Sequence, residues 1–384
     1  MAVLNDEQAM LKDMAVGWAR DRMPIAVARG LYDHSGGGRP GDEPGFARDA
    51  YAEMAAMGWT GILVPQQFDG ADFGYLSLGL VIEELGRTLA PSPLISSALA
   101  AASALRLGGS PDQQRRWLPG IAEGSVVGTV AVDEGARHAP EQTGLAAHRI
   151  DGGWRLEGMK RPVQDGMGAD LFIVAARTSG KPGDTDGITL FLVPADGAGI
   201  VRRALDQIDA RRPALLQIEG TTLGEDAVLG ELDRGFPLLE AILDRARIGL
   251  AAEMLGLATQ AFETTLDYLK TRVQFGRIIG SFQALQHRAA EMFAELQLTR
   301  SAVETALAAL DADAPDIALH ASLAKAIAGE TAHLISNQMV QLHGGIGMTH
   351  EHDAGLYLKR ARVAAQCYGS PSFHRERWGR LSGY

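Results

Sequence analysis

Two changes of pattern, at about Gly124 and about Gly235, most constrain what this 384-residue chain can fold into. Between them lie short β-rich runs separated by Gly, Asp and Pro clusters: "VVGTVAV", "WRLEG", "DLFIVAA", "ITLFLVP" and "ALLQIEG". The gaps leave no room for the crossover helices that a doubly wound parallel sheet requires. The middle of the chain is therefore predicted to form a small antiparallel sheet or barrel.

Both flanks of this β-rich region have helical spacing. Before it, apolar residues recur three and four apart in "DEQAMLKDMAVGWARDRM", "ARDAYAEMAAMG", "SLGLVIEELGRTL" and "DQQRRWLPGIAEG". After it come three long apolar-striped segments, and a last helix is expected from His352 to Tyr368. The Gly-rich stretch from Asp33 to Gly45 is expected to be a surface loop.

These patterns predict an α+β multidomain chain. We expect an N-terminal α-helical domain over residues 1–124, a middle antiparallel β domain over 125–235 and a C-terminal four-helix bundle over 236–384. The sequence shows no internal repeat.

Composition excludes several classes of protein. A net charge of −11 argues against nucleic-acid binding, which relies on clustered Lys and Arg. No window approaches the ~18 uninterrupted apolar residues of a membrane span, and the start "MAVLNDEQAM" lacks the basic and apolar regions of a signal peptide. Cys367 is the only cysteine, so an intramolecular disulfide is impossible. We therefore expect a cytoplasmic protein that has no membrane or nucleic-acid partner.

Three common catalytic or nucleotide-binding motifs are absent from the sequence. It contains no G-x-S-x-G nucleophile elbow, no phosphate loop ending in Gly-Lys-Ser/Thr and no G-x-G-x-x-G after a strand. Serine hydrolysis and classical Rossmann nucleotide binding are therefore poor candidates.

The segment "QLHGGIGMTHEHD" gathers His343, His350, His352 and Asp353. Residues two apart on a helix point away from each other, and the spacing fits no established zinc pattern, so no metal site is expected. The glycines are expected to form a tight turn between two bundle helices. Its backbone N–H groups could bind an anion, or the turn could be purely structural.

The segment "KTRVQFGRIIGSFQALQHR" is more specific. A helix is expected to end near Arg272, Gly276 to break it, and a new helix to start at Ser281. Arginine, phenylalanine and glutamine around one break could bind a phosphate, stack on a ring and read an amide edge. The alternative is a helix-capping corner whose arginine pairs with a nearby acid.

A shorter segment, "LDRAR", puts Asp244 and Arg247 three positions apart on one helical face. Such a pair is most often a solvated ion pair on a helix surface.

Two long stretches resemble the acyl-CoA dehydrogenase family. "YLKTRVQFGRIIGSFQALQHRAAEM" is similar to the family's Y-x-x-x-R-x-x-F-G-x-x-I-x-x-F-Q-x-x-Q stretch, and "QLHGGIGMTHEHDAGLYLKRARVAAQCYGS" to its Q-x-x-G-G-x-G-x-x-x-E segment with the closing helix. The earlier "MGWTGILVPQQFDGADFG" resembles the family's G-x-x-G-x-x-x-P-x-x-x-G-G. The resemblance covers essentially the whole chain and implies the same order of helical, β and helical-bundle domains.

The resemblance implies residues for two ligands. Six residues would hold the pyrophosphate and adenosine end of an FAD: Arg272, Phe275, Gln283, Gln341, Gly344 and Gly345. In the family these positions reach into a neighbouring subunit's flavin site, so a homo- or hetero-oligomer is implied. Asp244 and Arg247 stand where the family contacts the CoA moiety of its thioester substrate.

The position of the family's catalytic base is altered. Family members usually place a glutamate in Y-E-G-T, whereas "CYGS" puts Tyr368 there. Some members instead place the base immediately before the matched arginine, where this chain has Ala246. Tyrosine has an unperturbed pKa of about 10, so only ~0.1% is phenolate at pH 7, which makes Tyr368 a poor base. No catalytic residue is therefore assigned.

The flavin-facing β segments differ as well. The family's T-E-P-x-A-G-S-D appears as "VDEGARHAP", and its W-I-T, which lies beside the flavin ring, appears as Pro162 to Gln164. Proline offers neither an aromatic face nor a backbone N–H. The residues with which a subunit would bind the ring of its own flavin thus differ from the family pattern. Those that it would contribute to a neighbouring subunit's flavin site match the pattern.

The resemblance implies an FAD-dependent oxidoreductase of fatty acid or steroid degradation that passes electrons to a transfer protein. Our leading hypothesis is a non-catalytic subunit of a heteromeric enzyme for a bulky, steroid-type acyl-CoA, because the family includes α2β2 assemblies with one degenerate subunit. One alternative is a self-sufficient homo-oligomer with an unrecognised base. Another is a flavin-free protein that binds acyl-CoA or acts as a scaffold.

Overall fold

The computed structural model describes residues 4–34, 44–209 and 211–384, so most of the predicted loop from Asp33 to Gly45 lies outside the described residues. The chain divides into two compact units. The first, here called the helical unit, comprises residues 1–33, 75–90 and 247–384. The second, here called the sheet unit, comprises residues 34–74 and 91–246.

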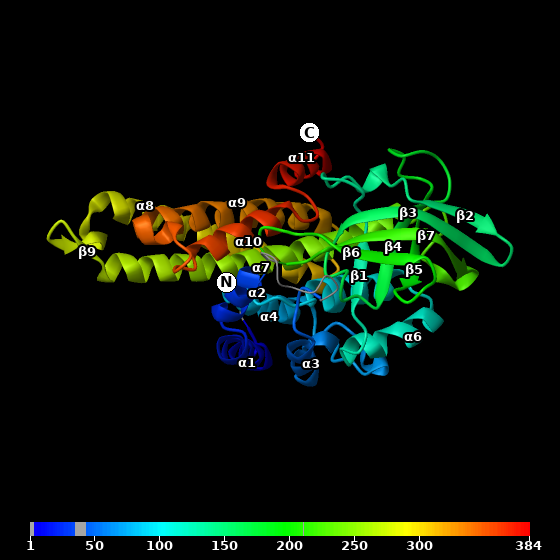
Figure 1. The fold of residues 1–384 in the computed structure, drawn as a ribbon, viewed down its shortest axis with the longest axis horizontal. Helices are drawn as coiled ribbons and strands as arrows, with labels where there is room; N and C mark the ends of the chain where they lie inside the picture. The colour runs from blue at the N-terminus through cyan, green and yellow to red at the C-terminus, as the bar shows by residue number, and fades with distance from the viewer. Residues whose placement is uncertain (1–3, 35–43, 210) are drawn as a thin grey trace. The chain divides into compact units, whose positions relative to one another are not determined.

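The sheet unit contains an eight-stranded sheet (Figure 1) with the order β6-β7-β3-β2-β4-β5-β8, in which β1 pairs with β4. The strands are β1 (Gly128–Ala131), β2 (Ala146–Ile150), β3 (Gly153–Val163), β4 (Leu171–Arg177), β5 (Ile188–Pro194), β6 (Ile200–Ala204), β7 (Ala214–Gly224) and β8 (Val228–Leu229). Every pairing is antiparallel except those of β1 and β2 with β4, which are parallel.

The central strands β4 and β5 are apolar along almost their whole length because both of their faces are buried. Val174 pairs with Phe191 in the register between them. The Trp154 ring from β3 meets the Phe191 ring edge to face at 5.5 Å, which anchors the core of the sheet.

Short helices complete the sheet unit. They are α3 (Arg48–Ala56), η1 (Trp59–Gly61), η2 (Gln66–Phe68), the π-helical η3 (Ile95–Ala101), α5 (Ala102–Gly108), α6 (Pro111–Ala122), η4 (Pro140–Gln142) and η5 (Glu225–Ala227). The start of α6 follows from its sequence: Ser110 and Gln113 form a capping box, and Pro111 occupies the first helical position.

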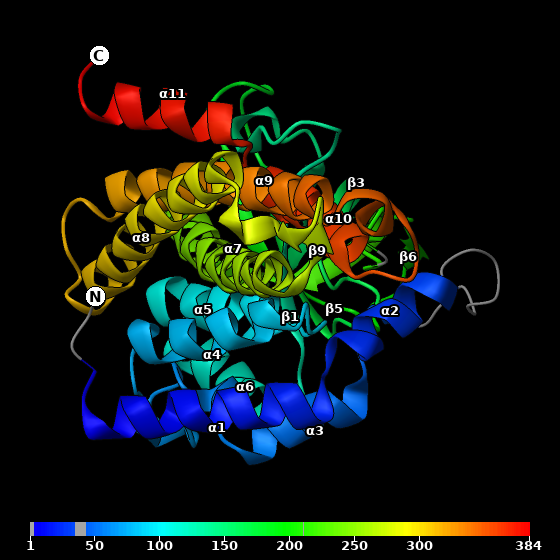
Figure 2. The same ribbon diagram turned by 90° about the vertical axis from the view of Figure 1, so that its left-hand side faces the viewer.

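The helical unit is built from longer helices, which Figure 2 shows from the end of the bundle. They are α1 (Asp6–Arg22), α2 (Ile25–His34), α4 (Tyr75–Arg87), α7 (Phe236–Thr271), α8 (Gln283–Asp311), α9 (Ile317–His343), η7 (Gly344–Met348), α10 (Ala354–Gln366) and α11 (Pro371–Leu381). The boundary between the units falls inside α7, between Ala246 and Arg247.

Helices α4 and α7 pack with their backbones unusually close. A Cβ atom on Gly86 would lie 2.3 Å from the Glu253 carbonyl oxygen, and one on Gly256 would lie 1.8 Å from the Glu83 carbonyl oxygen. Only glycine fits at such a distance. This crossing ties an early segment of the chain to the C-terminal helices.

The predicted order of a helical region, a β region and a helical bundle is confirmed. Several elements were not predicted, among them two next to predicted site residues. A hairpin of β9 (Val273–Gln274) and β10 (Arg277–Ile278) stands where only a break at Gly276 was expected, and η6 (Ile279–Ser281) follows it. Helix α11 begins directly at Pro371 after the expected break. The bounds of the three predicted domains stay a prediction.

Candidate functional site

Tyr368 lies in the short link between α10 and α11, here called the Tyr368 turn (residues 367–370). Its φ is +53°, an uncommon value for a residue with a side chain, and the next residue, Gly369, has a φ of +114°. The residue is 7% exposed. The position that corresponds to the family's base is therefore a buried and conformationally defined site.

Side chains from three helices bind the backbone carbonyls around this turn. Arg247 of α7 donates from Nε to the Tyr368 oxygen at 3.1 Å. His374 of α11 places Nε2 3.1 Å from the same oxygen, and because a carbonyl only accepts, that nitrogen is the donor. Lys325 of α9 donates from Nζ to the carbonyl oxygens of Ala365, at 3.0 Å, and Gly369, at 3.2 Å.

Sequence reasoning missed Lys325 and His374, both of which are fully buried. The signal for Lys325 was a single lysine within the apolar stretch "ASLAKAIAG". Burial lowers the pKa of Lys325 to about 7, nearby Cys367 opposes this shift, and the Arg247 and Arg360 guanidinium groups reinforce it.

The turn itself contains Cys367, Tyr368, Gly369 and Ser370, and therefore no carboxylate. Ala246, the alternative base position, is a buried residue of α7 with 1% exposure. Neither of the two positions at which the resemblance implies a base therefore carries a carboxylate.

Asp244 and Arg247 are both buried in α7, with exposures of 3% and 0%. A solvated surface ion pair is therefore excluded for this motif. Contact with the CoA moiety, which the resemblance implies, stays a prediction.

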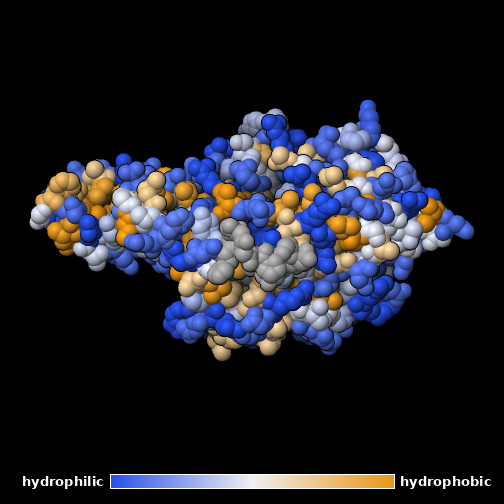
Figure 3. Space-filling view, in the orientation of Figure 1, coloured by the Kyte–Doolittle hydropathy of each residue, from blue (hydrophilic) through white to orange (hydrophobic). Residues whose placement is uncertain are grey.

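The residues expected at the adenosine end of a flavin lie on two exposed segments of the helical unit. Arg272 directly follows α7, Phe275 lies at the tip of the β9–β10 hairpin, and Gln283 is the first residue of α8. Phe275 has a φ of +52° and is 90% exposed. Figure 1 shows the hairpin at the end of the bundle, and apolar side chains gather at that end in Figure 3.

The second exposed segment is the glycine turn after α9. Gln341, Gly344 and Gly345 are all exposed. Gly344 has a φ of +64°, and a Cβ atom added to it would meet no atom within 4 Å. This backbone is open to an approaching ligand. Binding of a flavin by these residues stays a prediction.

Histidine and tyrosine rings support the glycine turn from inside. The His343 ring lies 4.3 Å from Tyr268 and 4.2 Å from His352, and its Nδ1 donates to the Met339 carbonyl oxygen at 2.7 Å. Burial lowers the pKa of His343. Within the described part of the chain, no group of three or more His, Cys, Asp or Glu side chains could hold a metal ion.

In the sheet unit, the loop at residues 132–140, which resembles the family's T-E-P-x-A-G-S-D, is held by hydrogen bonds of its own side chains. His138 places Nδ1 2.9 and 3.0 Å from the two Asp133 carboxylate oxygens, and both side chains are largely buried. Glu134 accepts hydrogen bonds from the backbone N–H groups of Gly144 and Leu145, at 3.0 and 2.9 Å. Lys160, fully buried, donates to Glu134 at 2.7 Å.

These residues do not fit a flavin ring. The ring's carbonyl oxygens and N5 need hydrogen-bond donors, but the Asp133 side chain is already bonded to His138. Pro162 offers no N–H and no aromatic face. In contrast, the exposed arginine, aromatic ring and glycine backbone of the helical unit suit the phosphate and adenine end of the cofactor.

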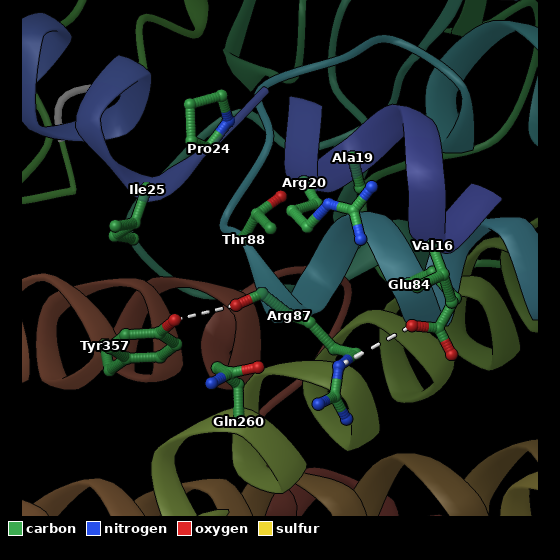
Figure 4. Close-up of a pocket in the computed structure, with 10 residues that line it drawn as sticks. All are labelled: Val16, Ala19, Arg20, Pro24, Ile25, Glu84, Arg87, Thr88, Gln260 and Tyr357. Atoms are coloured by element: carbon green, nitrogen blue, oxygen red, sulfur yellow. Dashed lines mark hydrogen bonds and ion pairs between the residues drawn. The ribbon is translucent and has the colours of Figure 1, made fainter. Parts of the chain in front are cut away.

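A separate cavity of about 360 Å³ lies in the helical unit (Figure 4), and none of the site residues predicted above line it. Its lining includes Glu84, Arg87, Gln260 and Tyr357. Tyr357 donates its hydroxyl to the Arg87 carbonyl oxygen at 2.7 Å, and Arg87 Nε lies 3.6 Å from the Glu84 carboxylate. Burial raises the pKa of Glu84 despite nearby Lys12.

None of the helices in the described residues is both long and apolar enough to cross a membrane.

Comparison with known proteins identifies two matching family profiles and similar relatives. The profiles "Acyl-CoA dehydrogenase, N-terminal domain" and "Acyl-CoA dehydrogenase, C-terminal domain" match residues 5–125 and 233–381. Acyl-CoA dehydrogenase IpdE2 of Mycolicibacterium smegmatis is 31% identical over 325 residues, which cover 85% of this chain and 84% of the relative.

Solved structures of similar proteins match this chain over almost its whole length. A variant of the steroid acyl-CoA dehydrogenase (steroid ACAD) Tcur3481–Tcur3483 is 30% identical to this chain. The match covers 98% of this chain and 98% of the matched chain, with a TM-score of 0.85. A chain of the ChsE4–ChsE5 complex of Mycobacterium tuberculosis is 25% identical to this chain. The match covers 100% of each of the two compared chains and has a TM-score of 0.88. This chain belongs to the acyl-CoA dehydrogenase family, whose members carry FAD.

Proposed function

We propose that this chain is the non-catalytic subunit of a heteromeric acyl-CoA dehydrogenase that acts on a bulky, steroid-type acyl-CoA. One observation carries the proposal: buried side chains hold the Tyr368 turn in place through hydrogen bonds, yet the turn contains no carboxylate. Since Ala246 occupies the alternative base position, the proton-abstracting group would belong to another chain.

The exposed segments support the part of the proposal that concerns the cofactor. Phe275 is an aromatic residue that this chain leaves 90% exposed, and Val273 and Ile278 of the same hairpin are 55% and 46% exposed. Apolar side chains in such a cluster are typical of a surface that another subunit covers. In the proposed assembly, the hairpin and the glycine turn hold the adenosine and pyrophosphate end of an FAD in the partner's site.

The sheet unit supports the same asymmetry. With Asp133 bound to His138 and Pro162 in place of an aromatic residue, this chain offers little to a flavin ring of its own. We therefore expect one FAD for each pair of unlike chains. When bound, FAD accepts the β-hydrogen of the acyl thioester as hydride, while Asp244 and Arg247 of this chain are proposed to contact a CoA moiety.

The substrate class is inferred from the relatives. One of the similar structures is described as a steroid ACAD, and another is a complex of two named chains. Both descriptions are consistent with a heteromer, and the first motivates the choice of a steroid-type acyl group.

The test is purification of the tagged full-length chain from its native host, with mass spectrometry of co-purifying proteins and a flavin count per chain. The expected result is a second acyl-CoA dehydrogenase chain at equal amount and one FAD per pair. Tyr368→Phe in the complex is expected to leave kcat unchanged, because Tyr368 abstracts no proton.

Two outcomes would count against the proposal. A homo-oligomer with one FAD per chain that turns over acyl-CoA, and that loses activity on Tyr368→Phe, would identify a self-sufficient enzyme with an unrecognised base. A complex that contains the partner but no flavin would instead indicate an acyl-CoA-binding or scaffold role.

A further inference from the structure

Lys325 is a fully buried lysine that has no carboxylate partner in the described part of the helical unit. Its Nζ donates only to backbone, to the carbonyl oxygens of Ala365 and Gly369. The other fully buried lysine, Lys160 of the sheet unit, differs because its ammonium lies 2.7 Å from the Glu134 carboxylate. Buried charges are normally paired in this way, and Lys325 departs from that rule.

The groups that face Lys325 from the surrounding helices are mainly cationic. Helix α7 contributes Arg247, α10 contributes Arg360, and the Tyr368 turn contributes Cys367. On α11, His374 bonds to the Tyr368 carbonyl oxygen and Arg377 to the Ser322 hydroxyl. Arg360 is itself paired with Glu253 of α7 through contacts of 2.9 and 2.7 Å. Where α8 meets α9, the neutral hydroxyls of Thr299 and Thr331 bond to each other at 2.8 Å.

An ammonium group in these surroundings is unfavourable. Desolvation and two neighbouring guanidinium groups both disfavour the charged form, and they lower the pKa of Lys325 to about 7. The amine can therefore gain or lose its proton near neutral pH without any change in its surroundings. If water reaches Lys325, its pKa returns toward 10.5, and the amine takes up a proton.

We propose that Lys325 is a positioning residue for Tyr368 and acts as a proton-controlled latch. When the Tyr368 turn opens, the Lys325 amine loses its hydrogen bonds to the carbonyl oxygens of Ala365 and Gly369. Water then reaches the amine, which becomes protonated. The turn depends on these contacts, because Tyr368 and Gly369 both hold left-handed backbone angles. The proposal concerns this chain's own residues and holds whether or not the chain is a non-catalytic subunit.

The direction of the pH effect follows from linkage. Between pH 7 and 10.5 the closed turn holds a neutral amine, while the open turn holds an ammonium, so opening takes up a proton. Opening therefore becomes less favourable as pH rises through this range, by up to about tenfold per pH unit. Below pH 7 both states are protonated, and the opening equilibrium no longer changes with pH.

The test is amide hydrogen exchange of the full-length chain between pH 6 and 8.5, corrected for intrinsic exchange rates. The reporters are the amides of Cys367 and Gly369, which donate to Val363 and Gln366. Their protection is expected to be level from pH 6 to 7 and then to rise up to about tenfold per pH unit. In Lys325→Met the rise should be absent.

Lys160→Met is the matched control, because it also removes a fully buried lysine but lies in the sheet unit. It is expected to leave the pH dependence of the Cys367 and Gly369 amides unchanged. An equal pH dependence in Lys325→Met would overturn the proposal.

A second readout is made on the wild-type chain and uses the variant only to assign one resonance. In the wild-type chain with ¹³C-labelled lysine, the Cε resonance that Lys325→Met removes should titrate between pH 6 and 8. A Lys325 resonance that stays constant up to pH 9 would refute the latch, because the amine would then remain charged in the closed turn.

Discussion

Arg247 and Tyr368, 121 positions apart in the sequence, are joined by a hydrogen bond of 3.1 Å from the guanidinium Nε to the backbone carbonyl oxygen. The guanidinium also lies 5.7 Å from the centre of the Phe373 ring on α11. One side chain of α7 therefore holds both the turn after α10 and the helix that follows it.

Replacing this arginine should destabilise the helical unit. Arg247→Met is expected to lower the free energy of unfolding by about 1–3 kcal/mol, because it leaves the buried Tyr368 carbonyl with fewer donors. Urea unfolding followed by circular dichroism measures the change. Arg375→Met on the exposed side of α11 is the control and should change stability by less than about 0.5 kcal/mol.

The second prediction concerns the glycine beside Tyr368. Gly369 has a φ of +114°, and an added Cβ would lie 2.5 Å from Cδ1 of Phe373. Gly369→Ala is therefore expected to cost about 2 kcal/mol or more in thermal or urea unfolding. Gly355→Ala on α10, where no atom lies within 4 Å of the added Cβ, should be neutral or slightly stabilising. Equal effects of the two substitutions would contradict the observed turn.

The third prediction tests the crossing of α4 and α7. Gly256→Ala places a methyl group against the Glu83 carbonyl and is expected to cost about 3 kcal/mol or more, or to prevent folding. Gly17→Ala on α1 meets no atom within 4 Å and should stabilise the chain by roughly 0.5–1 kcal/mol, since alanine favours helix. Unfolding midpoints of the two variants should move in opposite directions.

The fourth prediction concerns the exposed hairpin and rests on the proposed function. Phe275→Ala should leave unfolding of the isolated chain unchanged within about 0.5 kcal/mol, because the ring is 90% exposed. In the complex with the catalytic partner, the same substitution should reduce bound FAD, measured from the flavin absorbance per chain. Met10→Ala, at an exposed residue of α1, is the control and should keep the flavin content.

The fifth prediction concerns the pH dependence of Glu84 in the cavity of Figure 4. Burial raises the pKa of this carboxyl above its ordinary value of 4.5, so the folded state binds the proton more tightly than the unfolded state. Stability is therefore lost as pH rises through the range between these two pKa values. Glu84→Gln should be stabilising relative to wild type at pH 7, and the difference should shrink towards pH 4.5. A difference that grows on acidification would contradict the sign.

Much of the fold could be predicted because long periodic segments leave few alternatives. The start of α1 at Asp6 follows from a capping box of Asn5 and Gln8, and β5 occupies the same residues, Ile188 to Pro194, as its apolar run. Strands β2 and β6 were missed, because they are short, partly exposed and carry arginines that weaken the apolar alternation. Helix α11 was missed although Ser370 and Pro371 form a good helix start.

The candidate site was predictable only in part. Arg272, Phe275 and the glycines at 344 and 345 could be identified because their motif is local. The hairpin could not, because two-residue strands carry almost no periodic signal. The contacts of Lys325 and Arg247 with the Tyr368 turn join residues far apart in sequence, and no local pattern reports such convergence.

The close contact of α4 with α7 limits how this chain can be divided for experiments. Since Gly86 and Gly256 bring the two backbones together, a fragment that begins at residue 236 would leave uncovered the face of α7 that residues 75–90 now protect. Such a fragment should aggregate when expressed alone, and supplying residues 1–90 as a separate polypeptide should rescue its solubility. Truncation studies of this chain therefore need to keep its early helices.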